Sequence, residues 1–226
     1  MLSAIIVAAG SSQRLGFDKL TASIAGKPVI VHTIAAFQGT FSVDEIIIVT
    51  RADRVTEFEK LLGGIKKISA IVAGGEHRHD SVRAGLERII DSTTFVAVHD
   101  AARPLITPAQ IEQVFEHAVL HHAATLAEPV RDTLKRANSQ LLVTDSVDRQ
   151  DLYAMQTPQI FERELLQDAY RKVAELEQMV TDEVSAVQLL GREIALVENR
   201  EPNLKITYEH DLALAESVLI RRQGGM

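Results

Sequence analysis

Cysteine and tryptophan are absent from this sequence, and so is any apolar run long enough to cross a membrane. Without cysteine there are no disulfides, thiolate metal sites or cysteine nucleophiles, which fits a reducing compartment. A membrane-spanning helix needs about 20 apolar residues, and the N-terminus lacks a basic region ahead of an apolar one. We therefore expect a cytoplasmic protein with no membrane partner.

Positive charge is also scarce, because 24 lysines and arginines stand against 31 acidic residues, giving a formal net charge of −7. Nucleic-acid binding normally rests on a basic face, and single-strand binding adds aromatic side chains on which bases stack. With three tyrosines and no tryptophan, we expect no nucleic-acid partner. A few local cations could still hold a small anionic ligand.

Strand-like and helix-like segments alternate through the first two thirds of the 226 residues. Apolar and β-branched runs predict strands at 5–8, 45–50, 67–73, 94–98 and 123–127, with helices between them. Such repeated units indicate an α/β fold, a Rossmann-like, mainly parallel sheet with helices on both faces. We expect one domain over residues 1–226.

Residues 130–147 interrupt this alternation. Two strand-like segments flank a turn at Asn138-Ser139, which predicts a β-hairpin arm at about 130–149. An isolated hairpin is marginally stable in water, so a partner subunit is the simplest surface for it to pack against. Beyond the arm we expect a turn at 156–159, helices at 163–176, 181–190 and 209–222, and short strands at 194–198 and 204–207.

The first strand leads into a loop suited to phosphate. Ala8, Ala9 and Gly10 end the strand with small residues that let a ligand approach the backbone, and Arg14 and Lys19 follow as cations. The alternative is that both cations are solvated loop charges. The loop matches neither the dinucleotide-binding glycine pattern nor the P-loop, which disfavours an NAD-dependent oxidoreductase on the same type of sheet.

Asp100 stands at the end of the strand at 94–98, where a carboxylate can hold Mg²⁺ together with phosphate oxygens. Arg103 could grip a phosphate with two hydrogen bonds. The alternative is that Asp100 caps the next segment and pairs with Arg103. Because ligands bind at the carboxyl ends of parallel strands, the loop at Gly10, the pair Gly74-Gly75 and Asp100 should meet at one edge of the sheet.

Several further clusters are weaker on their own. Gly75, Glu76 and Ser81 surround a helix start that could read a base or a ribose. His77 and His79, like His117 and His121, lack a third metal ligand at a recognisable spacing. We expect the first pair to be exposed loop histidines and the second pair to lie at the surface or at an interface. Lys205 is flanked by apolar residues, as an ordinary edge-strand lysine would also be.

Taken in order, these segments resemble 2-C-methyl-D-erythritol 4-phosphate cytidylyltransferases along nearly the whole chain. The resemblance rests on residues 8–10 with Arg14 and Lys19, and on the motifs at 74–82, 98–104, 129–135, 147–149, 156–159, 181–183 and 203–207. The sequence departs from the family's pattern at Ser12, Asp18 and Glu76, where glycine, proline and aspartate are common.

The resemblance implies that CTP and a sugar-alcohol phosphate are joined with release of pyrophosphate, with Mg²⁺ as cofactor. It implies catalytic roles for Arg14, Lys19 and Lys205, with Asp100 as the Mg²⁺ ligand. It also implies two binding sets: for CTP Ala8, Ala9, Gly10, Gly75, Glu76, Ser81 and Asp100, and for the sugar phosphate Arg103, Thr133, Arg149 and Thr181.

The family's hairpin is an arm exchanged across a homodimer, which implies that Thr133 and Arg149 reach the neighbouring subunit's site. Two alternatives stay open at this point. Ribitol 5-phosphate cytidylyltransferases share much of the pattern and differ in the acceptor. A nucleotide-binding protein without turnover would retain the fold, although the joint presence of Arg14, Lys19, Asp100 and Lys205 argues against it.

Overall fold

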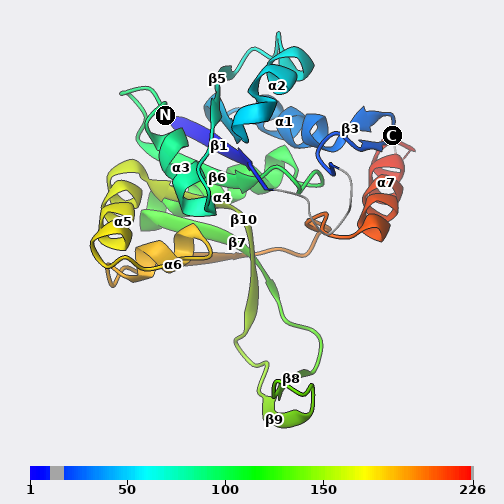
Figure 1. Ribbon diagram of the computed structural model, residues 1–226, viewed down its shortest axis with the longest axis vertical. Helices are drawn as coiled ribbons and strands as arrows, with labels where there is room; N and C mark the ends of the chain where they lie inside the picture. The colour runs from blue at the N-terminus through cyan, green and yellow to red at the C-terminus, as the bar shows by residue number, and fades with distance from the viewer. Residues whose placement is uncertain (11–17, 225–226) are drawn as a thin grey trace.

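The computed structural model describes residues 1–10 and 18–224 and has a seven-stranded sheet at its centre (Figure 1). The strand order is β11-β7-β10-β6-β1-β4-β5, and every neighbouring pair is parallel except those that β10 makes. This confirms the expected mainly parallel α/β fold. The strands are β1 Leu2–Ala8, β4 Val43–Thr50, β5 Ile68–Ala73, β6 Phe95–Asp100, β7 Ala123–Pro129, β10 Tyr153–Glu162 and β11 Ala195–Glu198.

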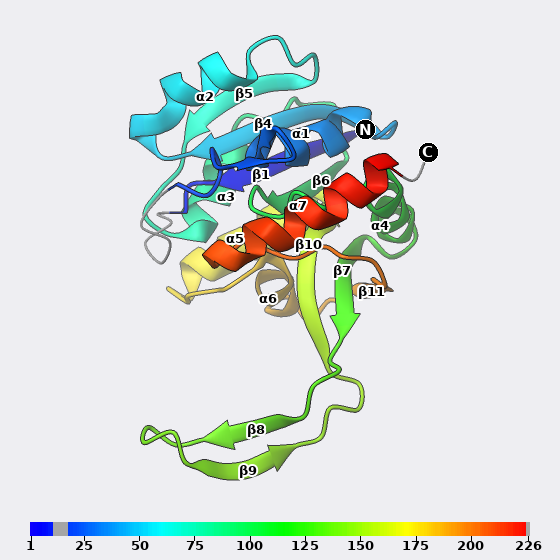
Figure 2. The same cartoon turned by 90° about the vertical axis from the view of Figure 1, so that its right-hand side faces the viewer.

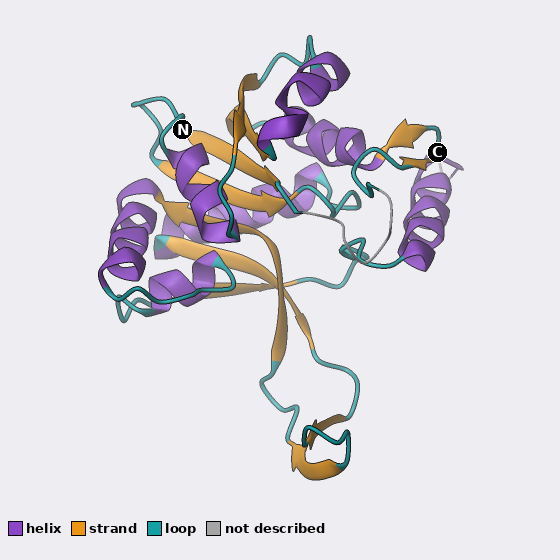
Figure 3. Ribbon diagram, viewed as in Figure 1, coloured by secondary structure: helices purple, strands orange, loops and turns teal. Residues whose placement is uncertain are grey.

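Helices cover both faces of the sheet (Figure 3). One face packs against α1 (Val29–Gly39), α2 (Val55–Leu62), α4 (Pro108–His121) and α7 (Glu209–Gly224). The other packs against α3 (Arg78–Leu86), α5 (Arg163–Glu175) and α6 (Glu183–Gln188). Because side chains alternate along a strand, Ile6 of β1 joins the first core and Ile5 the second. A short 3₁₀ turn, Ala52–Arg54, precedes α2, and the small strands β2 (Ser23–Ile24) and β3 (Lys27–Pro28) precede α1.

A glycine lets helix α3 pack directly against the sheet. A methyl group on Gly85 would stand 2.7 Å from Cγ2 of Ile5, so a larger residue would force the helix away from β1. Gly85 lies in the last turn of α3, so this end of the helix packs directly on β1. The helix begins at Arg78, whose Nε lies 3.5 Å from Oδ1 of Asp100 at the carboxyl edge of the sheet.

The carboxyl ends of the parallel strands meet as expected. Val7 is paired with Asp100, and Ala8 with Thr50 of β4. The amide of Gly74 donates to the carbonyl of Thr50 at 2.7 Å. The three sequence features predicted to share one edge of the sheet therefore do so.

The arm (residues 130–149) projects from the sheet between β7 and β10 (Figures 1 and 2). Its two strands, β8 (Leu134–Ala137) and β9 (Val143–Val147), are shorter than predicted and pair antiparallel. Large apolar side chains at the tip are exposed, and Leu141 is 86% accessible. The hairpin prediction is confirmed, and within this chain the arm leaves its apolar tip uncovered.

Two predicted elements were wrong. Residues 156–159 lie inside β10 rather than in a turn, with a cis peptide bond between Thr157 and Pro158. Residues 204–207 form a coil rather than a strand. The coil is held by isolated hydrogen bonds, such as the one from the Ile206 amide to the Ala102 carbonyl at 2.8 Å, instead of the regular hydrogen-bond ladder of a strand. Among the described helices, none has the length and apolar composition needed to span a bilayer.

Candidate active site at the carboxyl edge of the sheet

Asp100 is the centre of a cluster of cations at the end of β6. Its Oδ2 atom lies 2.8 Å from Nζ of Lys205 and 3.7 Å from Nε of Arg103. Its Oδ1 atom lies 3.5 Å from Nε of Arg78. The carboxylate side chain is only 11% exposed, so these charges interact with little screening by water.

The surroundings keep Asp100 ionised. Burial alone would raise the pKa of its carboxyl, but the positive charges of Arg78, Lys205 and Arg103 outweigh burial and hold the pKa well below its usual range. One carboxylate thus faces three cations. The excess of positive charge suits a ligand that carries several negative charges, such as a polyphosphate.

A buried hydrogen-bond chain fixes the backbone of Asp100. Its amide donates to Oγ1 of Thr157 at 3.1 Å, and the same hydroxyl lies 3.0 Å from Nδ1 of His99. The carbonyl of Arg103, 3.3 Å from Nε2 of His99, can only accept, so Nε2 carries the proton of the neutral ring and Nδ1 accepts from the Thr157 hydroxyl. Burial lowers the pKa of His99 to about 3, so the ring is neutral near pH 7.

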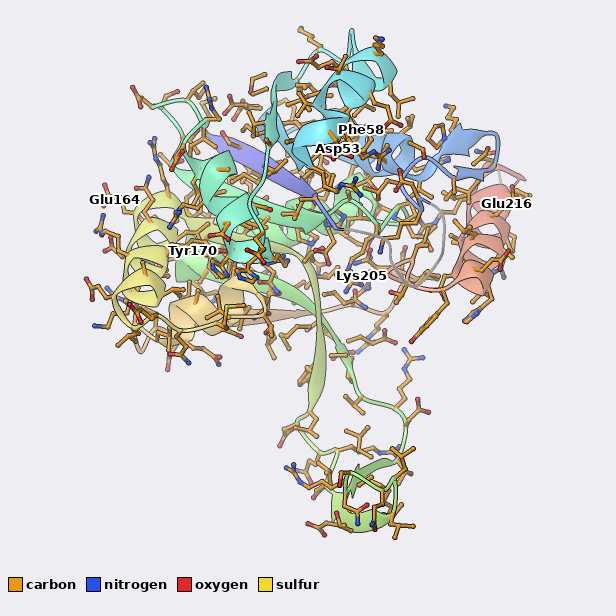
Figure 4. The ribbon with its side chains drawn as sticks, in the orientation of Figure 1. Asp53, Phe58, Glu164, Tyr170, Lys205 and Glu216 are labelled. Carbon is orange, nitrogen blue, oxygen red and sulfur yellow. The ribbon has the colours of Figure 1, made fainter. Side chains whose placement is uncertain are left out.

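The coil at 199–207 presents Lys205 to the cluster. Asn203 donates to Oε1 of Gln156 at 3.0 Å and to the carbonyl of Thr157 at 3.0 Å, and its own carbonyl accepts from Arg103 at 2.7 Å. Nζ of Lys19 donates to the carbonyl of Ile206 at 2.9 Å. Two of the three predicted catalytic lysine and arginine residues therefore converge on this coil, and Figure 4 shows Lys205 where the core meets the base of the arm.

The predicted nucleotide-binding residues lie along the same edge. Ala8 ends β1, and Ala9 and Gly10 follow it. Gly75 and Glu76 are exposed in the loop before α3, and Ser81 is buried, with its hydroxyl donating to the carbonyl of His77 at 3.3 Å. A methyl on Gly74 would stand 2.4 Å from Oγ of Ser81, so glycine lets this loop lie directly on the helix.

Other predicted residues stand apart from the cluster. Thr133 and Arg149 belong to the arm, where Arg149 donates to the carbonyl of Arg131. Thr181 is exposed ahead of α6, with its hydroxyl 3.5 Å from that of Ser185. Arg14 lies outside the described residues.

Sequence reasoning missed the role of Arg78 and its partners. Arg78 reaches Asp100 and also donates to Oε1 of Glu183, a fully buried carboxylate that accepts from the Tyr170 hydroxyl at 2.8 Å. In Figure 4, Tyr170 lies on the α5 side of the strand ends and Lys205 on the α7 side. Both residues of the Arg78–Glu183 pair stand within motifs noted above, but nothing in their spacing pairs them.

The residues present fit a divalent cation shared with phosphate groups. Mg²⁺ is usually held by one or two carboxylates together with phosphate oxygens, and Asp100 is a single ionised carboxylate at the expected edge. Within the described residues, histidine and carboxylate side chains form no group of three that could hold a metal ion alone. The donor set therefore suits Mg²⁺ brought with a polyphosphate better than a site built entirely from protein ligands.

Comparisons with known proteins show similarity along nearly the whole chain. The family model described as "IspD: 2-C-methyl-D-erythritol 4-phosphate cytidylyltransferase" matches residues 2–221. The enzyme of that name from Pelotomaculum thermopropionicum is 39% identical over 99% of this chain and 96% of its own length. Its namesake from Caldanaerobacter subterraneus is 41% identical over 96% and 98%.

A solved structure shares the whole architecture. The crystal structure of 4-diphosphocytidyl-2C-methyl-D-erythritolsynthase from Anaerococcus prevotii aligns with a TM-score of 0.86 at 27% identity, covering 98% of this chain and 96% of that one. The Francisella tularensis enzyme aligns with a TM-score of 0.82 at 28% identity, covering 96% and 98%. With a family model that matches nearly the whole chain and relatives about two fifths identical, the chain belongs to the IspD family of 2-C-methyl-D-erythritol 4-phosphate cytidylyltransferases.

Proposed function

We propose that this enzyme joins CTP to 2-C-methyl-D-erythritol 4-phosphate, releasing pyrophosphate and the CDP-linked product. The observation that carries the proposal is the cluster of Arg78, Arg103 and Lys205 around Asp100, at the strand ends of a chain that belongs to this family. The reaction gathers a triphosphate, a phosphate monoester and a metal ion. Three cations face Asp100, and even with Glu183 paired to Arg78 they outnumber the carboxylates of the cluster, which suits that set of charges.

The chemistry needs charge neutralisation more than proton transfer. A phosphate monoester loses its second proton near pH 6, so the attacking oxygen is already anionic at neutral pH. Its attack on the α-phosphorus of CTP places negative charge on the α-phosphate and on the departing pyrophosphate. Preorganised cations stabilise such a transition state.

We assign this stabilisation to Lys19 and Lys205, together with Arg14 from the loop outside the described residues. Lys19 and Lys205 are joined through the coil at 205–206, so their ammonium groups approach the same edge. Asp100 would hold Mg²⁺, which when bound neutralises charge on the phosphate oxygens. Lys205 would then exchange its ion pair with Asp100 for a phosphate group.

We assign CTP to the edge formed by residues 8–10, Gly75, Glu76 and Ser81. Here small residues leave room for a base and a ribose, and backbone N–H groups can donate hydrogen bonds to them. The sugar phosphate is assigned to Arg103 and Thr181 of one subunit, and to Thr133 and Arg149 of a partner's arm. The exposed apolar tip of the arm supports a homodimer, since such a surface is costly to leave in water. The absence of cysteine supports a cytoplasmic location.

A paired acceptor assay tests the proposal. Purified protein with CTP and Mg²⁺ should release pyrophosphate with 2-C-methyl-D-erythritol 4-phosphate, and much more slowly with ribitol 5-phosphate or without an acceptor. A strong preference for ribitol 5-phosphate would change the substrate assignment. Binding of CTP by calorimetry without turnover of either acceptor would overturn the catalytic proposal.

A further inference from the structure

We propose that Glu183 is a positioning residue that holds Arg78 against one oxygen of Asp100 and so leaves the other oxygen available to a divalent cation. The inference rests on the proposed function, because it takes Asp100 as the metal ligand. It assigns a task to a buried carboxylate that the reaction itself does not use. Arg78 acts as the link between the two carboxylates.

The two carboxylates use different groups of the same guanidinium. Nη1 of Arg78 donates to Oε1 of Glu183, while Nε faces Oδ1 of Asp100 at 3.5 Å. A planar guanidinium can bridge two acceptors in fixed directions, which the point charge of a lysine cannot do. The orientation of Arg78 at Asp100 is therefore set by where Glu183 lies.

Glu183 is itself held by hydrogen bonds at its side-chain Oε1 and at its backbone amide. Its carboxylate is fully buried and accepts from the Tyr170 hydroxyl of α5 at 2.8 Å. Its amide donates to Oε1 of Gln159 in β10 at 3.1 Å, and Gln159 in turn donates to Asp182 at 3.0 Å. A buried carboxylate is costly unless it is paired, so the pair with Arg78 is a strong constraint on both side chains.

The cations around Asp100 differ in how firmly they are held. The Arg78 side chain is 24% exposed and has a second carboxylate partner, whereas Lys205 is 43% exposed and, within the described residues, forms an ion pair with Asp100 alone. Arg78 thus stays on Oδ1 when the ligands arrive, while Lys205 can leave Oδ2 for a phosphate. Arg103, whose Nε lies 3.7 Å from Oδ2, is beyond hydrogen-bonding distance of that oxygen. Carboxylates that bind metals are commonly oriented by such outer partners, whose loss costs about 10–100-fold in metal affinity or activity.

The test compares Glu183→Gln with a matched control. Gln keeps the size of the side chain and removes its charge, so Arg78 should lose its fixed orientation. Glu45→Gln is the control, since Glu45 is also a buried carboxylate with hydroxyl partners, Ser3 at 2.8 Å and Ser69 at 2.6 Å, but lies in the first half of β4, toward the opposite edge. Circular dichroism and thermal unfolding establish that each variant is folded.

Calorimetry then measures two affinities without any acceptor, one for CTP with saturating Mg²⁺ and one for CTP in EDTA. In Glu183→Gln we expect about 10–100-fold weaker binding with Mg²⁺ and little change in EDTA, because the defect acts on the metal ligand. Glu45→Gln should match the wild type in both. Equal losses with and without Mg²⁺, or no loss in a folded variant, would overturn the proposal.

Tyr170→Phe is a second test in case Glu183→Gln fails to fold, because it removes only one hydroxyl. It should weaken binding with Mg²⁺ in the same direction and by less, and an unchanged affinity in both variants would contradict the role of this cluster. The measurement needs no sugar phosphate. A metal-dependent loss in Glu183→Gln would therefore stand even if the acceptor assay overturned the proposed substrate.

Discussion

Nζ of Lys205 lies 2.8 Å from Oδ2 of Asp100, although one residue ends a central strand and the other belongs to a coil near the end of the chain. The pairing joins a cation and a carboxylate that the proposed reaction needs to separate. Asp100 would bind the metal ion and Lys205 a phosphate. The ion pair therefore keeps the proposed metal ligand and the proposed phosphate-binding lysine next to each other at the carboxyl edge of the sheet before the ligands bind.

Lys205→Ala should lower kcat about 10²–10³-fold, corresponding to about 2.7–4 kcal/mol of transition-state stabilisation. The lysine is 43% exposed, so the free energy of unfolding should change little. Steady-state kinetics with thermal unfolding as a control separates the two effects. Wild-type turnover in the variant would remove Lys205 from the catalytic residues.

Gly74→Ala should weaken CTP binding. The new methyl would stand 2.4 Å from Oγ of Ser81 and 3.0 Å from Cγ1 of Val49, so the loop or α3 must shift. Overpacking costs about 1–3 kcal/mol, and KM for CTP should rise about tenfold if some 1.4 kcal/mol of it opposes binding. Gly39→Ala is the control, because its methyl would meet only Pro108 at an ordinary 3.7 Å. Equal KM values in both variants would contradict this account.

Arg149→Ala should raise KM for the sugar phosphate about 10–100-fold, as expected for loss of a charge-assisted hydrogen bond of about 1.5–3 kcal/mol. Affinity for CTP should stay the same, since Arg149 belongs to the arm and not to the strand ends. Arg136→Ala, another exposed arginine of the arm, should leave both constants unchanged. A parallel loss of CTP affinity would place Arg149 elsewhere in the site.

Leu142→Asp should shift the enzyme from dimer to monomer in sedimentation experiments. Leu141, Leu142 and Val143 are 86%, 60% and 68% exposed at the tip of the arm, and a charge there opposes burial against a partner. Phe41→Asp tests whether any exposed apolar residue has this effect, because Phe41 is 96% exposed outside the arm. A wild-type protein that sediments as a monomer would contradict the exchanged arm.

Stability should depend on pH through His99. Burial lowers the pKa of this residue to about 3 from 6.5, so between these values the unfolded chain binds a proton that the folded protein does not. The free energy of unfolding should therefore fall by up to about 1.4 kcal/mol per pH unit as the pH drops below about 6.5. Urea unfolding without Mg²⁺ should show a shallower slope for His99→Gln than for the wild type. Equal slopes would mean that His99 titrates normally in the folded protein.

Much of the fold could be predicted because hydrophobic periodicity and helix caps are local signals. Thr107 and Pro108 mark the start of α4, and the structure has the helix at Pro108–His121 with Thr107 capping it. β10 was missed because Pro158 removes a ladder donor and is typical of turns. The strand accommodates it where the pairing with β7 shifts register, between Met155 and Gln159.

The candidate site could be predicted only in part, since contacts between distant segments leave no spacing to recognise. That Asp100 belongs to the site could be predicted, because it follows an apolar run typical of a buried strand. Its bond to Lys205 and the pair formed by Arg78 and Glu183 depend on how a late coil and α6 fold back onto the sheet. The Asn203 bonds that replace a strand at 204–207 are likewise visible only in three dimensions.

Strand β10 also limits how this enzyme can change in length. It runs from the base of the arm into the sheet, and Thr157 and Gln159 each depend on facing the correct side of it. Inserting or deleting a single residue before Thr157 would turn these side chains to the opposite face. Chain length can therefore vary at the turn near Leu141, whose neighbours are exposed, but not along the strand that carries the arm.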